Sequence, residues 1–184
     1  MKGEGKVKKY EVALFLKGKG ATDYTRIKKA TELKLEFGAS TQDYDYIADE
    51  NPTIELDKYK PEISGLPLTM YREEPDFALI WDLAYNLKTG GEAVVDLLLV
   101  YKFDEDAAKA GTWKAWNVPA TVVVKTLDAV DGKIEFDLQL RGTVIKGTVT
   151  EEGGKPKFKA AGEELKPVPG KPGEFVVTGK AKDA

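Results

Sequence analysis

An apolar helical segment inside an otherwise β-type pattern constrains the fold of this chain most. Glu73, Glu74 and Pro75 place acidic groups and a proline at the first turn of a helix. Apolar side chains then recur at helical spacing, and Gly90-Gly91 is predicted to end the run. The sequence therefore predicts one α-helix over about residues 75–88. Its recurring apolar residues are Phe77, Ile80, Trp81, Ala84 and Leu87.

The predicted helix has an unusually narrow polar side. Leu79 and Leu83 widen its apolar surface until Asp82 and Asn86 form only a thin polar stripe. A helix that lies on one sheet normally has a broader solvated face. We therefore expect this helix to contact two surfaces, the second belonging to a neighbouring copy, and we expect Trp81 to pack in the core. The five recurring apolar residues are the candidates for this subunit interface.

Alternation of apolar and polar residues marks the predicted strands. The clearest example places Ile134, Phe136 and Leu138 on one face, and it follows a tight-turn signal at Asp131-Gly132. Weaker alternation predicts strands near residues 10–16, 33–37, 42–46, 54–57, 63–71 and 118–124. The long strand at 95–103 is partly apolar on both faces, so both faces should be covered. The expected fold is mainly β: an antiparallel β-sandwich or barrel with one flanking α-helix and long loops.

The 184 residues suit one domain with a tail. Apolar residues make up 42% of the chain, which is enough for a substantial core. We predict a β-sandwich domain over residues 1–150, beginning with an N-terminal arm at 1–9. Glycine, proline and lysine dominate residues 151–184, so this extension should be partly flexible, with weak strands near Phe158 and 175–177.

The composition argues against common forms of catalysis and metal binding. The chain has no cysteine and no histidine, which removes thiolate ligands and the commonest general base. Ser40 and Ser64, the only serines, have no histidine to activate them. A glycosidase-type carboxylate pair needs neither residue, but no spacing supports one. We expect no enzyme activity, no cofactor and no metal site. No stretch has the length of a membrane span, and the net charge of −3 argues against a DNA-coating protein.

Five segments carry a resemblance to a known family. They are Tyr46–Pro52, Leu66–Tyr71, the helix after Pro75, the strand at Ala93–Phe103 and the Asp131-Gly132 hairpin, roughly two-thirds of the chain. Their order and character resemble the tail tube (major tail) proteins of long-tailed bacteriophages, which are related in fold to the type VI secretion tube protein.

The resemblance implies a structural virion protein. Members of that family form hexameric rings that stack into a tube through which DNA is delivered. The expected partners are further copies of the chain, other tail proteins, and DNA that passes through the lumen without specific binding, with no membrane partner. The expected location is the virion tail, after synthesis in the host cytoplasm. Segments at residues 1–9, 22–28, 39–50 and 104–111 are candidates for bridging rings.

DNA passage requires a lumen that does not hold phosphate. A negative lining achieves this by like-charge repulsion, which salt screens over about 8–10 Å. Acidic residues on polar strand faces are therefore candidates for the lumen, although each also suits an ordinary solvated face. They are Glu135, Asp137, Glu32, Glu36, Asp96 and Glu92.

Two other functional classes remain open from the sequence. One is a monomeric β-barrel that binds a small apolar ligand in its interior. The other is a decoration or adhesin-like domain on a virion surface. Size measurement at high concentration separates these from a tube subunit, because only the tube subunit should form rings or filaments.

Overall fold

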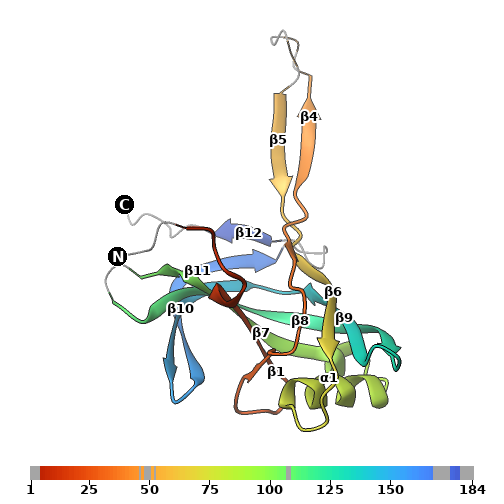
Figure 1. Ribbon diagram of the computed structural model, residues 1–184. Helices are drawn as coiled ribbons and strands as arrows, with labels where there is room; N and C mark the ends of the chain where they lie inside the picture. Colours follow the sequence, from red (N-terminus) through yellow and green to blue (C-terminus); the bar gives the residue numbers. More distant parts are fainter. Residues whose placement is uncertain are drawn as a thin grey trace.

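The computed structural model describes residues 5–45, 47, 51, 53–106, 109–167 and 175–178. These residues form a ten-stranded antiparallel sheet, a separate two-stranded hairpin and one α-helix (Figure 1). The predicted mainly β fold with a single α-helix is therefore confirmed. Parts of some predicted segments lie outside the described residues: the start of the N-terminal arm, most of Tyr46–Pro52, two residues of the segment at 104–111 and much of the C-terminal extension.

The elements follow one another in a simple order. Two 3₁₀ helices are labelled η1 and η2, at Lys9–Glu11 and Gly90–Ala93, and the α-helix α1 spans Pro75–Tyr85. The strands are β1 (Val12–Lys17), β2 (Thr25–Arg26), β3 (Leu35–Glu36), β4 (Ser40–Tyr44), β5 (Thr53–Lys58), β6 (Glu62–Thr69), β7 (Val94–Glu105), β8 (Thr112–Asp128), β9 (Lys133–Leu140), β10 (Val144–Glu152), β11 (Lys155–Pro167) and β12 (Phe175–Thr178).

Strand β8 organises the large sheet because different strands pair along its length. One edge pairs with β7, while the other edge pairs first with β10 and then with β9. Between β9 and β10 the chain bends at Gly142, whose φ is 76°, and the amide of Arg141 donates to the carbonyl of Pro119 at 2.8 Å. The sheet therefore divides into β12-β11-β10-β8-β7-β1-β2 and β8-β9-β6-β3, which share β8. The described strands form no closed barrel.

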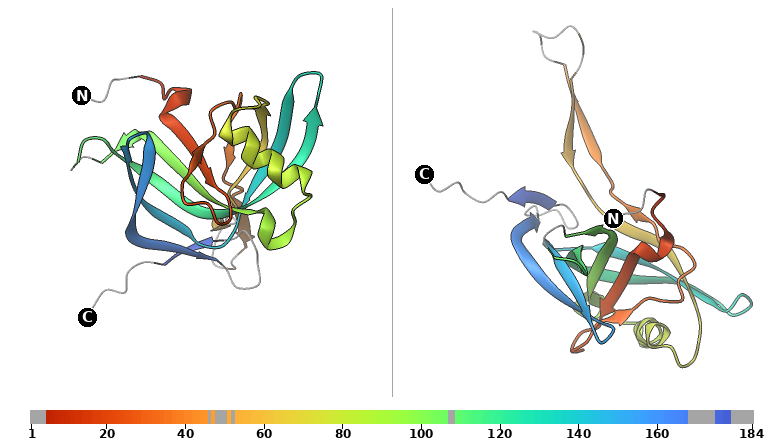
Figure 2. Two further views of the ribbon diagram at one scale, coloured as in Figure 1. Left: turned by 90° about the horizontal axis from the view of Figure 1, so that it is seen from below. Right: turned by 60° about the vertical axis from the view of Figure 1, so that its left-hand side comes forward.

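Two hydrophobic cores lie on opposite faces of the sheet. The main core includes Leu16, Leu97 and Phe136, and the second core includes Phe15 and Leu98. Neighbours along β1 and β7 enter different cores because side chains alternate across a strand. This confirms that both faces of the long strand β7 are covered. In Figure 2, the β8–β9 and β10–β11 hairpins extend from different sides of the molecule.

Helix α1 begins at Pro75 as predicted but ends at Tyr85, earlier than residue 88. The chain leaves the helix through Leu87, which has a φ of 46°, a conformation usually left to glycine. Gly90-Gly91 instead opens η2, so the predicted stop is wrong. Trp81 was expected in the core, but 40% of its surface is exposed. No helix in the described part of the chain is long and apolar enough to cross a membrane.

Two predicted boundaries differ from the structure. The strand expected at 33–37 contracts to the two residues of β3, because Leu33 and Leu35 are only partly buried and pair little. The domain limit at residue 150 falls inside β10, and β11 pairs along β10 from Lys155 to Leu165. The described beginning of the C-terminal extension therefore continues the same sheet.

Candidate assembly surfaces

Four carboxylates gather on one face of the β3-β6-β9-β8 part of the sheet. Glu36 pairs in register with Glu62, which pairs with Gln139. Alternation along β9 places Glu135 and Asp137 on the same face as Gln139, opposite the main core. We call Glu36, Glu62, Glu135 and Asp137 the acidic face. The structure thus brings together three of the six predicted lumen residues and adds Glu62.

Asp137 anchors this face. It is 8% exposed, and its carboxylate forms an ion pair with Lys125 (Nζ–Oδ2 2.7 Å) and accepts a hydrogen bond from the amide of Gly65 at 2.8 Å. The hydrogen bond to Asp137 raises the pKa of Lys125 despite the opposing effect of desolvation, and the charges of Glu135 and Glu62 add to the increase. Asp137 is therefore held by the fold, while the other three carboxylates are more accessible.

The remaining predicted lumen residues lie apart from this cluster. Asp96 shares the same face of the continuous sheet by register, but on β7, where it pairs with Lys17 at 3.1 Å. Glu32 precedes β3 and pairs with Lys34 at 2.7 Å, and Glu92 lies in η2. Sequence reasoning missed Glu62 because the predicted strand began at Ile63, and the register shift between Ile63 and Leu66 breaks the alternation along β6. Whether the acidic face lines a lumen stays a prediction.

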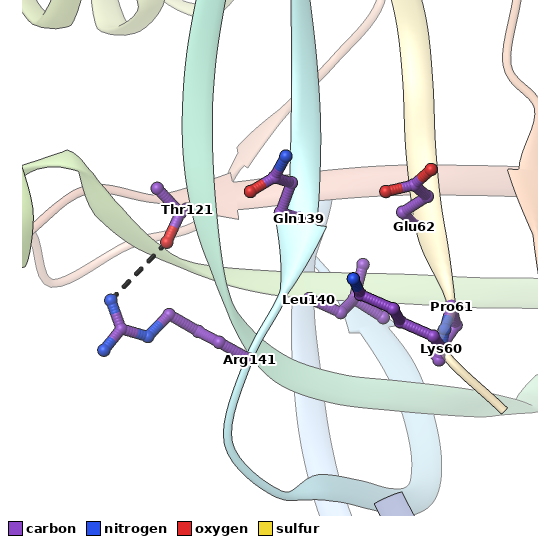
Figure 3. A pocket seen from close by; sticks show the side chains of 7 residues that line it. All are labelled: Lys60, Pro61, Glu62, Thr121, Gln139, Leu140 and Arg141. Atoms are coloured by element: carbon purple, nitrogen blue, oxygen red, sulfur yellow. Dashed lines mark hydrogen bonds between the residues drawn. The ribbon is translucent and has the colours of Figure 1, made fainter. Parts of the chain in front are cut away.

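An open pocket of about 570 Å³ adjoins the acidic face at one end of β9 (Figure 3). Glu62 and Lys60 lie on one side, and Arg141, which donates to the hydroxyl of Thr121 at 3.5 Å, lies on the other. Its lining contains no serine, cysteine or histidine nucleophile. Among the described residues, no group of three or more acidic side chains converges as a metal site would. This pocket offers surface contacts and no recognisable catalytic arrangement.

An aromatic row runs along the outer side of α1. Phe77 stacks on Trp81 with ring centroids 6.1 Å apart, and Trp81 lies 5.6 Å from Tyr85. Tyr85 and Leu87 are 72% and 82% exposed.

The five predicted interface residues of the helix divide between two environments. Ile80 is completely buried inside the chain, and Phe77 and Ala84 pack against the main core. Only Trp81 and Leu87 of the predicted set are exposed enough to offer a second molecule substantial surface. The interface role of the helix stays a prediction.

Strands β4 and β5 form a hairpin that projects from the sheet (Figures 1 and 2). We call residues 40–45 and 53–58 the projecting hairpin. Strands β4 and β5 contact each other extensively but make few contacts with the other described elements. Ile54 and Leu56 are 69% and 50% exposed. At its base, Phe37 lies edge-on to Trp116 at 6.2 Å between ring centroids. The hairpin is therefore anchored to β8 at its base while its strands remain exposed.

The other predicted bridging segments are less exposed or only partly described. In the segment at 22–28, Ile27 is 9% exposed and Tyr24 packs against the second core, so this segment belongs partly to the body of the domain. Residues 107–108 of the segment at 104–111 lie outside the described residues. Residues 5–9 of the N-terminal arm are exposed and lead into η1.

Comparison with known proteins gives a structural similarity but no match to a family or a curated protein. The chain is similar to a chain in the cryo-EM structure of the anti-feeding prophage (AFP) baseplate, six-fold symmetrised. The two are 10% identical, the similarity covers 76% of this chain and 93% of that one, and the TM-score is 0.41. A TM-score at this level does not define a shared fold.

Proposed function

We propose that this chain is a structural subunit of a phage-like tail, and more specifically a tail tube subunit. Copies assemble into hexameric rings, the rings stack, and DNA passes through the lumen without specific binding. The chain has no catalytic role and needs no cofactor in this proposal. The sequence resemblance supports it, and the projecting hairpin is the structural observation that carries it.

In a monomer, the projecting hairpin would leave apolar side chains exposed to solvent. A two-stranded hairpin is marginally stable alone in water, because it buries little apolar surface. Ile54 and Leu56 leave 69% and 50% of their surface in solvent, and fully burying an exposed side chain of this kind contributes about 1.5–3 kcal/mol. A second molecule packed against the hairpin recovers this free energy and covers its strand edges. A monomeric binding module has no comparable use for such a hairpin.

The exposed row on α1 and the acidic face support the same proposal. Trp81, Tyr85 and Leu87 form a second apolar surface, distant in sequence from the hairpin. Contacts between different surfaces of identical copies are head-to-tail, so they close into rings or propagate as filaments. The acidic face would line the lumen, where its carboxylates repel the DNA phosphates.

Electron microscopy of concentrated protein tests the proposal. We expect rings or tubes from the full chain. Removing residues 43–54 and joining Gln42 to Glu55, which are paired in register, through Asn-Gly should abolish them while leaving the melting temperature nearly unchanged. A full chain that stays monomeric at the highest attainable concentration and in the presence of preformed tail structures would overturn the proposal.

A matched pair of substitutions separates the two faces of the hairpin. Ile54→Ser with Leu56→Ser removes the apolar side chains of one face and should weaken assembly strongly. Gln42→Ser with Thr53→Ser also substitutes two residues, but on the opposite face, and should leave assembly intact. Equal assembly by both variants would show that the apolar face of the hairpin is not buried in the tube.

A further inference from the structure

A basic-rimmed groove opens between β1 and the segment that follows β2. Its volume is about 490 Å³, and we call it the basic groove. The side chains of Leu14 and Leu66, nearly fully buried, contribute to its floor. Glu32 also lines it, but that carboxylate is paired with Lys34 at 2.7 Å. The basic residues that line the groove are Lys9, Arg26 and Lys28.

The basic groove lies along an incompletely paired edge of β1. On this side β2 pairs only with Phe15 and Leu16, and the amide of Ile27 adds one hydrogen bond to the carbonyl of Leu14 at 2.9 Å. The backbone groups of Val12 point to the same side as those of Leu14, because this direction alternates along a strand. Among the described strands, none pairs with Val12 on that side. An apolar floor beside an open strand edge is suited to an extended segment of another chain.

The projecting hairpin has a face with the complementary character. Its register pairs Asp43 with Ile54 and Thr41 with Leu56, so Asp43, Ile54 and Leu56 share one face. Glu55 pairs with Gln42 and lies on the opposite face. Neither Asp43 nor Glu55 makes an ion pair with a described residue. The described hairpin residues carry four carboxylates, at Asp43, Asp45, Glu55 and Asp57, against one ammonium group at Lys58.

We propose that the basic groove binds the projecting hairpin of a second copy of this chain. Ile54 and Leu56 pack on the apolar floor, and Asp43 lies against Lys28 at the rim. The apolar side chains select this face of the hairpin, since turning it over would replace Ile54 and Leu56 with the polar Gln42, Thr53 and Glu55. The groove and the hairpin are different surfaces, so the contact is head-to-tail and can propagate. This inference rests on the proposed function and names the contact through which it assembles.

Disulfide trapping tests the contact directly, because the chain has no cysteine of its own. Chains carrying Asp43→Cys are mixed with size-tagged chains carrying Lys28→Cys and oxidised. We expect the mixed dimer on a non-reducing gel. The matched control replaces Asp43→Cys with Glu55→Cys on the opposite face and should give at least about tenfold less mixed dimer, because burial of Ile54 and Leu56 in the groove turns that face away from Lys28. Both positions are exposed, so neither change disturbs the core.

A charge swap provides the second measurement. Asp43→Lys alone and Lys28→Glu alone should each weaken association by about tenfold or more, and the chain carrying both should recover it. Equal cross-linking by Asp43→Cys and Glu55→Cys, or a swapped chain that stays as weak as the single variants, overturns the groove contact. Tubes that form without the mixed cross-link overturn the groove contact but leave the proposed function standing. A mixed cross-link without any tube supports the contact and overturns the proposed function.

Discussion

At the scale of single residues, the carboxylate of Asp76 connects the start of α1 to the rim of the basic groove. Asp76 is fully buried, and it accepts hydrogen bonds from the amides of Lys28 at 2.9 Å and Lys29 at 3.2 Å. It also accepts one from the amide of Phe77 at 2.9 Å. A single side chain therefore satisfies three backbone donors and fixes the position from which Lys28 projects.

Asp76→Ala should lower the free energy of unfolding by about 2–4 kcal/mol, because it leaves these amides without their charged acceptor. Urea unfolding measures the change. Asp82→Ala removes an exposed carboxylate that pairs with Lys88, just beyond the end of the helix, and it should leave the urea midpoint almost unchanged. If the two variants unfold at the same urea concentration, Asp76 does not stabilise the fold in this way.

At the scale of elements, the packing of β11 against β10 leaves no room for a side chain at Gly147. A Cβ atom added there would lie 2.6 Å from the ring of Phe158, and also too close to the carbonyl of Lys159. Gly147→Ala should therefore destabilise the fold by about 1–3 kcal/mol. Gly91→Ala, where an added Cβ meets nothing within 4 Å, should be neutral or slightly stabilising in the same thermal unfolding measurement. A neutral result at Gly147 would mean that β11 does not pack on the second core.

The elements that sequence predicts well are those whose burial repeats regularly. Strand β9 has one buried face and one acidic face, so its alternation and the turn before it were readable. The end of α1 could not be predicted, because Leu87 adopts the left-handed conformation in place of the glycine that normally marks the end of a helix. The exposure of Trp81 was also missed, since apolar spacing does not reveal which side of a helix lacks a partner. Strand β11 was underestimated because its lysine and proline content resembles a loop, whereas Phe158 packs against the second core.

The candidate surfaces were less predictable than the strands. The acidity of Glu135 and Asp137 and their shared face follow from sequence, but Glu36 and Glu62 reach that face only through long-range pairing of β3, β6 and β9. Strands β4 and β5 project because they do not pair with the strands of the large sheet. A local sequence pattern predicts a strand but not which other strands it will pair with. The basic groove likewise arises where β1 and the segment after β2 separate in space.

At the scale of the whole molecule, the direction of the acidic face decides how DNA meets an assembled tube. A variant with Glu36→Lys, Glu62→Lys and Glu135→Lys keeps Asp137 and its anchoring contacts, and it changes the formal charge from −3 to +3, because each reversal adds two. A control with Glu73→Lys, Asp131→Lys and Glu152→Lys makes the same change at exposed positions away from this face. Both should assemble, which microscopy checks.

DNA added during assembly should be retained by tubes of the acidic-face variant and protected from nuclease, because a basic lumen holds phosphates that the native lumen repels. Raising the salt concentration should release the DNA, with a steep dependence on ionic strength. The control tubes should bind DNA only on their outer wall, where nuclease digests it. If DNA on the acidic-face variant is digested as completely as on the control, the acidic face points outward and the lumen is lined by other residues.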